Sequence, residues 1–240
     1  MYKRVLLKLS GEALKDEKSL AVYDGDYMAD LAKMMKELHD RGVEIGVVIG
    51  GGNIWRGKLR DEIGVDRVPA DFMGMMATVM NAIALQGALK RQGVDSIVFT
   101  ALPEIKDVSV TYTPEAAIKA MEEGKIAFFA GGTGKPYFTT DTAATMRALE
   151  TKCEAIIMGK NGVKGLYDKD PIKYKDAKFI PSITFREIID KNLQIMDLTA
   201  VELIKDKDID IRVFSMTDLD NFVKVVNGED IGTTCHRKGK

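Results

Sequence analysis

Short apolar runs that alternate with amphipathic stretches constrain the fold of this chain more than any other feature. The runs are typical of strands buried on both faces and span residues 4–9, 43–49, 96–100, 126–130, 155–159 and 211–215. Between the first two, Met28, Leu31, Met35 and Leu38 repeat at helical spacing. Strand-helix alternation with right-handed crossovers indicates a parallel sheet covered by helices on both faces. We therefore predict one α/β domain over residues 1–240, a three-layer αβα sandwich with a mostly parallel central sheet.

Glycine-bearing segments follow four of these predicted strands. They read "KLSGEA", "GGGNIWRG", "GGTGKPYFTTD" and "GKNGVKGLYDKDP". Glycine has no Cβ and tolerates positive φ, so backbone N–H groups in such segments can approach a phosphate closely. The carboxyl ends of parallel strands share one edge of a sheet, where helix N-termini also favour anions. The sequence therefore predicts a polyphosphate cleft at that edge.

The two common nucleotide-binding fingerprints do not fit. The segment "GGTGKP" resembles a P-loop, but that motif needs a glycine where Phe129 stands and a Ser or Thr where Pro136 stands. No G-x-G-x-x-G pattern opens the first predicted helix either. We expect separate loops to hold the phosphates.

Two basic residues are candidates for phosphate contacts. Lys8 ends an otherwise apolar strand, and a charged residue in a buried strand usually needs a partner, although it can also reach water from the strand end. Arg56 follows the triple glycine and has the planar fork that binds phosphate through two N–H groups. A weaker candidate for a second cation is Lys160, just beyond the fifth predicted strand.

Two acidic residues each allow two interpretations. Asp141 precedes a helical pattern, so it is either an N-cap or the group that orients Lys8 across the cleft. Asp170 precedes Pro171 and is either a turn residue or a contact for Mg²⁺ or the nucleotide. The closely spaced residues Met73, Met75, Met76 and Met80 are interpreted as a core or subunit-contact stripe.

Composition excludes several classes of protein. The chain has 35 basic and 36 acidic residues, so bulk charge gives no attraction to nucleic acid or to anionic membrane. We expect no apolar stretch long enough to span a bilayer and no signal peptide, which favours the cytoplasm. Cys153 and Cys235 lack the spacing of a zinc site or disulfide framework. The two histidines have no catalytic arrangement.

Four motifs carry a family resemblance. They are "KLSGEAL" at 8–14, "GGGNIWRG" at 50–57, "GTGKPYFTTDTAA" at 132–144 and "GLYDKDP" at 165–171. In this order and spacing the chain resembles, over nearly its whole length, the bacterial UMP kinases of the amino acid kinase superfamily. The resemblance implies an αβα sandwich, assembly as a homohexamer built from dimers, and transfer of a phosphoryl group from ATP to UMP with Mg²⁺, a step of pyrimidine nucleotide synthesis.

The resemblance also implies roles for individual residues, but it assigns no metal ligand. Lys8, Arg56 and Asp141 would be catalytic, with Asp141 organising the lysine. The ATP side would comprise Lys8, Leu9, Ser10, Gly11, Gly52, Arg56, Asn161, Tyr167 and Asp170. The UMP side would comprise Gly51, Asp71, Thr133, Gly134, Lys135, Pro136, Tyr137, Phe138, Thr139 and Thr140.

Two other functions remain open at this point. A relative on the same scaffold can phosphorylate a carboxylate or carbamate, but the segment 132–141 and Asp71 suit a nucleotide better than a small acid. A noncatalytic nucleotide-binding protein is the second alternative, and the presence of Lys8, Arg56, Asp141 and Asp170 argues against it. A phosphate monoester has a second pKa of about 6 and is largely dianionic near neutral pH, so UMP phosphorylation needs alignment and charge neutralisation rather than a strong base.

Overall fold

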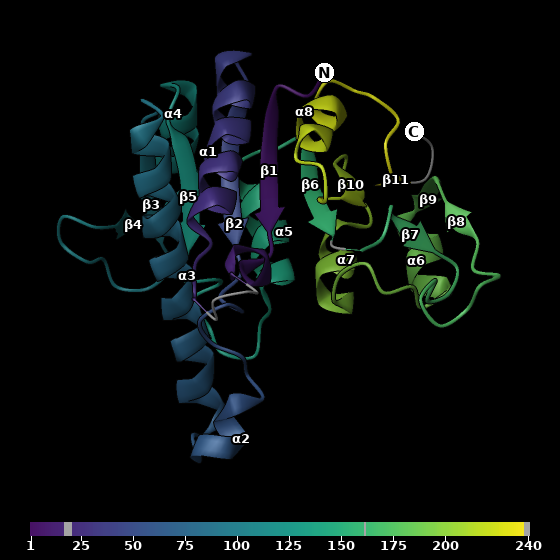
Figure 1. Cartoon of the computed structure of the whole chain (residues 1–240), viewed down its shortest axis with the longest axis horizontal. Coiled ribbons are helices and arrows are strands. Elements are labelled where there is room, and N and C mark those ends of the chain that lie inside the picture. Colours follow the sequence, from purple (N-terminus) through teal and green to yellow (C-terminus); the bar gives the residue numbers. More distant parts are fainter. Residues whose placement is uncertain (17–20, 161, 238–240) are drawn as a thin grey trace.

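A nine-stranded sheet forms the centre of the computed structural model, which describes residues 1–16, 21–160 and 162–237 (Figure 1). Its strands are β1 (Arg4–Leu9), β2 (Glu44–Ile49), β3 (Ser96–Thr100), β4 (Val110–Thr111), β5 (Ile126–Ala130), β6 (Ala155–Lys160), β9 (Ser182–Thr184), β10 (Asp210–Ser215) and β11 (Thr233–His236). They are ordered β4-β3-β5-β2-β1-β6-β10-β11-β9. A separate hairpin pairs β7 (Leu166–Tyr167) with β8 (Phe179–Ile180).

The sheet confirms the predicted parallel architecture. Within the described part of the chain, every neighbouring pair in the sheet runs parallel except β10 and β11. All six predicted strands are present, with ends that differ from the prediction by no more than one residue. The strands that the sequence did not reveal are β4, β7, β8, β9 and β11, of two to four residues each, which is too short for a hydrophobic period to show.

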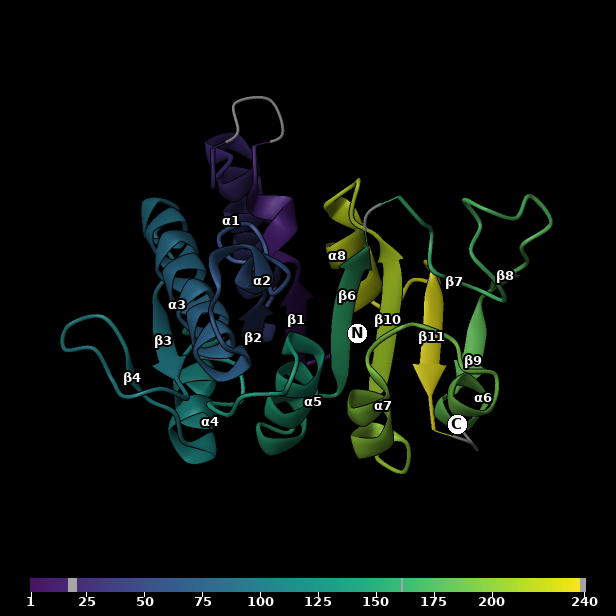
Figure 2. The same cartoon turned by 90° about the horizontal axis from the view of Figure 1, so that it is seen from below.

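Helices cover both faces of the sheet, as the sandwich prediction requires (Figure 2). One layer contains α1 (Gly25–Asp40), α3 (Arg67–Arg91) and α8 (Asp220–Val226), and the other contains α4 (Pro114–Glu122), α5 (Thr140–Glu150), α6 (Phe185–Asp190) and α7 (Leu198–Ile204). The short helices η1 (Gly11–Leu14) and α2 (Leu59–Ile63) follow β1 and β2. Apolar residues of the two layers form two separate clusters, one on each side of the sheet.

Helix α1 shows how the sequence sets this packing. Met28, Leu31, Met35 and Leu38 are buried as their spacing predicts, because residues three and four apart share one helical face. The helix begins where the Asp24 carboxylate accepts hydrogen bonds from two backbone N–H groups of the first turn.

Helix α3 corrects the expectation that no apolar stretch of the chain is long enough to span a bilayer. By length and composition alone it is long and apolar enough to cross a membrane, with a mean hydropathy of 1.4 over its most apolar window. Half of that window is buried inside the protein, as in a core helix. The methionines of this helix differ in exposure: Met75 is buried, whereas Met76 and Met80 are about half exposed. The core interpretation thus holds for Met75 and not for those two.

The glycine segments lie at one edge of the sheet. Strands β5, β2, β1 and β6 are consecutive neighbours and run parallel, so the segments that follow them emerge side by side. The turns after β1 and β2 approach each other most closely. The N–H of Gly50 donates to the Leu9 carbonyl at 3.1 Å, and a Cβ on Gly11 would overlap the carbonyl of Gly50. Glycine is therefore required at position 11.

Replacing Gly11 with alanine should lower the free energy of unfolding by about 1–3 kcal/mol, because the added methyl overpacks this junction. Gly87→Ala is the control, since nothing lies within 4 Å of a Cβ at that helical position, and it should leave stability unchanged or raise it by up to about 1 kcal/mol. Urea denaturation measures both. Equal stability of Gly11→Ala and the wild type would contradict the steric argument.

Candidate active site

An ion pair between Lys8 and Asp141 lies at the centre of the glycine-lined edge. The ammonium of Lys8 is 2.7 Å from the Asp141 carboxylate, and each side chain is about one-fifth exposed. Lys8 comes from β1 and Asp141 from the first turn of α5. The structure therefore brings together the lysine and aspartate that the cleft hypothesis pairs.

The N-cap interpretation of Asp141 is wrong. Helix α5 begins at Thr140, and its N-cap is Thr139, whose side chain accepts from the N–H groups of Asp141 and Thr142. The capping requirement is met by this hydroxyl, so the Asp141 carboxylate is available to Lys8.

Asp197, which the sequence did not reveal as a site residue, joins α5 to α7. Its carboxylate caps α7 by accepting from the N–H of Ala200 at 2.9 Å. The same carboxylate accepts from the hydroxyls of Thr139 and Thr142, the latter at 3.1 Å. An aspartate just before a helical pattern signals a cap, but the link to α5 spans more than fifty residues and leaves no local signal. Asp141 and Asp197 both line a cavity of about 400 Å³.

Arg56 lies beside the β1 and β2 turns but has a partner. Its guanidinium pairs with the Glu12 carboxylate of η1, and a Cβ on Gly52 would lie close to that same carboxylate. Both charged side chains are 40–46 % exposed, and exposed pairs of this kind contribute only about 0–1 kcal/mol. Glu12 therefore holds the Arg56 guanidinium only weakly.

A second cavity, of about 290 Å³, gathers three segments from the predicted UMP side. It lies between residues 51–57, 70–78 and 132–140. The predicted residues that line it are Gly51, Asp71, Thr133, Lys135, Phe138, Thr139 and Thr140. Gly134, Pro136 and Tyr137 belong to the same loop but do not line the cavity. The predicted ATP-side residue Gly52 also borders it.

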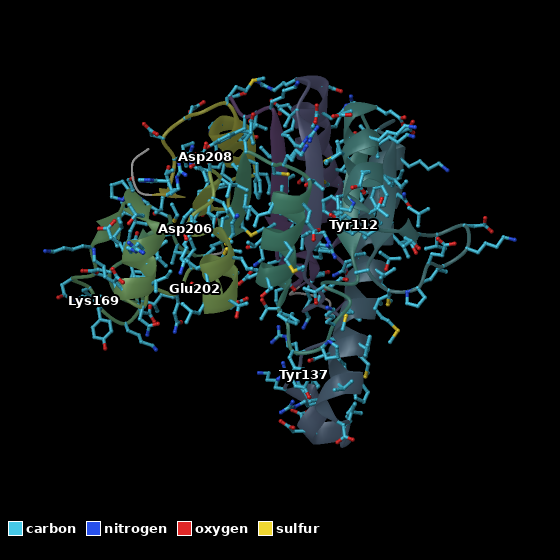
Figure 3. The ribbon with its side chains drawn as sticks, turned by 180° about the vertical axis from the view of Figure 1, so that it is seen from behind. Tyr112, Tyr137, Lys169, Glu202, Asp206 and Asp208 are labelled. Carbon is cyan, nitrogen blue, oxygen red and sulfur yellow. The ribbon has the colours of Figure 1, made fainter. Side chains whose placement is uncertain are left out.

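Asp71 is held as an anion at this cavity. Arg67 donates to both carboxylate oxygens, at 2.8 and 2.9 Å, and the Tyr137 N–H donates at 2.8 Å. Burial opposes ionisation, but these hydrogen bonds and the charge of Arg67 outweigh it and lower the pKa of Asp71. Tyr137 has a φ of 71°, which is unusual for a residue with a side chain and is often found at functional sites. In Figure 3 it lies beside the projecting end of α3.

A third cavity, of about 470 Å³, contains predicted ATP-side residues. Tyr167 and Asp170 line it from the β7 segment, and Lys160 lines it from the end of β6. The Asp170 carboxylate also accepts from the N–H of Ile172 at 2.9 Å, so its turn role is present. Asn161 lies outside the described residues.

The remaining predicted ATP-side residues follow β1. Leu9 ends the strand with its side chain only 2 % exposed, so only its backbone is placed to meet a ligand. Ser10 and Gly11 come next, and Gly11 packs against Gly50 of the neighbouring turn. Among residues 1–16, 21–160 and 162–237, no group of three or more His, Cys, Asp or Glu side chains is arranged to hold a metal ion.

Comparison with known proteins decides the family. A model of the amino acid kinase family matches residues 3–215. The chain belongs to the amino acid kinase family. A uridylate kinase of Mycoplasma capricolum subsp. capricolum is 53 % identical, and the alignment covers 95 % of each chain. The UMP kinase of Bacillus anthracis superposes with a TM-score of 0.95 at 34 % identity, covering 99 % of this chain and 97 % of its own.

A third relative agrees with this placement. The UMP kinase structure from Ureaplasma parvum superposes with a TM-score of 0.92 at 36 % identity and covers 99 % of this chain and all of its own. Both solved structures therefore match this chain over nearly the whole length of each protein.

The environment of Asp71 gives a prediction about pH. A carboxyl whose pKa is lowered on folding stabilises the protein above its unfolded pKa of about 3.9, and this contribution is lost as pH falls through the folded pKa. Asp71→Asn should therefore be less stable than the wild type at pH 7, and the difference should shrink below about pH 4. Urea titrations at several pH values measure it. A difference that is independent of pH would contradict the assignment.

Proposed function

We propose that this chain is a UMP kinase, which transfers the γ-phosphoryl group of ATP to UMP and releases ADP and UDP in pyrimidine nucleotide synthesis. The main support for this proposal is the Lys8–Asp141 ion pair at the sheet edge where the glycine segments meet. The neighbouring segments form the two cavities that contain the predicted UMP-side and ATP-side residues. Nearly full-length similarity to proteins named uridylate kinase supports the choice of acceptor.

In this proposal Lys8 stabilises the phosphoryl group during transfer. The group moves between two anions, so positive charge and precise alignment supply most of the catalysis. Asp141 is a positioning residue that fixes the lysine ammonium through their 2.7 Å contact. Arg56 leaves Glu12 and clamps a phosphate with two N–H groups.

The acceptor side follows from the chemistry of Asp71. An ionised carboxylate only accepts hydrogen bonds, and the two ribose hydroxyls of UMP are donors that match it. The loop 133–140 encloses the rest of the nucleotide. A small carboxylate or carbamate acceptor would leave the Asp71 carboxylate without such partners, which favours a nucleotide.

Magnesium is expected to arrive with ATP. Mg²⁺ is usually held by one or two carboxylates together with substrate phosphates and water, and the Asp141 carboxylate beside Lys8 fits that donor set. When bound, Mg²⁺ would offset negative charge on the transferred phosphates. This chain's own residues supply the remaining cations and the backbone N–H groups.

We also propose that the 240 residues act as one domain in a cytoplasmic homohexamer. The exposed apolar side chains of α3, among them Phe72, Met76 and Met80, support subunit contact, since an unpartnered apolar helix face commonly marks an interface.

A coupled assay of ADP release with ATP and Mg²⁺ tests the function. The acceptors are UMP, CMP, AMP, a glutamate analogue and carbamate, and UMP should give the highest kcat/KM. A higher value with the glutamate analogue or carbamate would favour the carboxylate-kinase alternative. Absence of ADP with every acceptor would favour a binding protein.

Lys8→Met should lower kcat by at least about 10²-fold, because a charge that stabilises the transferring group is lost. Lys3→Met is the control, since Lys3 precedes the same strand and is exposed. It should keep wild-type kcat. Both variants should unfold cooperatively near the wild-type temperature, and near-normal turnover of folded Lys8→Met would refute the role.

Asp71→Asn should raise the KM for UMP by about tenfold or more, since a charged hydrogen-bond acceptor to the substrate is lost. The KM for ATP should change by less than about threefold, within about 0.7 kcal/mol. Initial rates with each substrate varied in turn separate the two values. An equal rise in both would place Asp71 outside the UMP site.

A further inference from the structure

Lys160 lies on the same side of the sheet as Lys8. In the parallel register of β1 and β6, Lys8 pairs with Met158, and Lys160 follows two residues later. Side chains two apart in a strand share a face. Leu6 and Met158 belong to the apolar cluster that also contains residues of α5, so Lys8 and Lys160 both emerge toward the α5 layer.

Two lysines, Lys8 and Lys160, lie near the single carboxylate of Asp141. Asp141 forms an ion pair with Lys8, whereas in the described part of the chain Lys160 joins no ion pair. Burial and the positive charge of Lys8 lower the pKa of Lys160, and Asp141 acts in the opposite direction. Cys235 also faces this lysine, but burial raises the pKa of its thiol to about 12, so it is neutral. Two ammonium groups therefore share one carboxylate.

A partly buried cation without a partner is costly and is usually retained for a ligand. Lys160 lines the cavity of about 470 Å³ together with Tyr167 and Asp170. It thus lies between the Lys8–Asp141 pair and the residues assigned to ATP. A polyphosphate reaching from that cavity to Lys8 would pass Lys160.

We propose that Lys160 binds the triphosphate of ATP from the end of β6, as a second cation beside Lys8. This inference rests on the proposed use of ATP. Lys160 supplies a positive charge that Lys8 alone cannot, because part of the charge of Lys8 is neutralised by Asp141. Its contact is with the donor nucleotide and not with UMP.

The test compares Lys160→Met, Lys160→Arg and Lys164→Met with the wild type. Lys164 is an exposed lysine of the same loop that does not line the cavity, so it controls for loss of one positive charge. Calorimetry without UMP measures binding of Mg²⁺–ATP and of inorganic triphosphate. Lys160→Met should weaken both by about 10- to 100-fold, Lys160→Arg should recover part of the loss, and Lys164→Met should bind as the wild type does.

Stability measurements separate a binding role from a structural one. Removing an unpartnered charge from a partly buried site should leave the ligand-free Lys160→Met protein at least as stable as the wild type. In steady-state assays its KM for ATP should rise while its KM for UMP stays within about threefold. Unchanged affinity for ATP and triphosphate would overturn the proposal. So would a destabilised Lys160→Met protein whose binding Lys160→Arg does not restore.

The proposed function is judged by a different result. Turnover of UMP by the wild type tests the reaction, whereas the calorimetry on variants needs neither UMP nor turnover. A wild type that binds ATP without phosphorylating UMP would refute the function and leave the Lys160 comparison decisive.

Discussion

The close backbone contact between the ends of β1 and β2 is the constraint on which the site depends. The N–H of Gly50 reaches the Leu9 carbonyl, and Gly11 packs against Gly50 without room for a side chain. This contact sets the turns that carry Ser10, Gly52 and Arg56 beside each other. The parallel pairing of β1 and β2 brings these turns side by side, and the contact between Gly11 and Gly50 fixes how closely they approach.

The cations of the candidate site differ in how far their charge is balanced by neighbouring carboxylates. Two of its cations have acidic partners: Lys8 has Asp141 inside the cleft, and Arg56 has Glu12 near solvent. The Lys8–Asp141 pair is mostly shielded from solvent and fixes the position of the ammonium group, whereas the more exposed Arg56–Glu12 pair is weak. Lys160 adds a charge without a counterpart in the described chain. Stability and binding therefore make opposite demands at the end of β6.

The sequence predicted the long parallel strands and their shared edge because these depend on local patterns. Six apolar runs were sufficient, since a buried parallel strand is almost uniformly apolar. The two interpretations of Asp141 could not be separated from the sequence, because Thr139 and Asp141 are both good capping residues and only the backbone geometry distinguishes them. The role of Asp197 was not predicted because Asp197 and its partner Thr142 are 55 residues apart in the sequence. The short edge strands lacked enough residues to show a period.

The bridge formed by Asp197 joins two helices that lie far apart in the sequence. Thr139 lines the cavity assigned to UMP, and Asp197 lines the neighbouring cavity that also contains Asp141. Because Asp197 accepts from Thr139 and also caps α7, one carboxylate holds the start of α5 and the start of α7 together. Neither helix can therefore be displaced there without breaking a hydrogen bond that also positions the other.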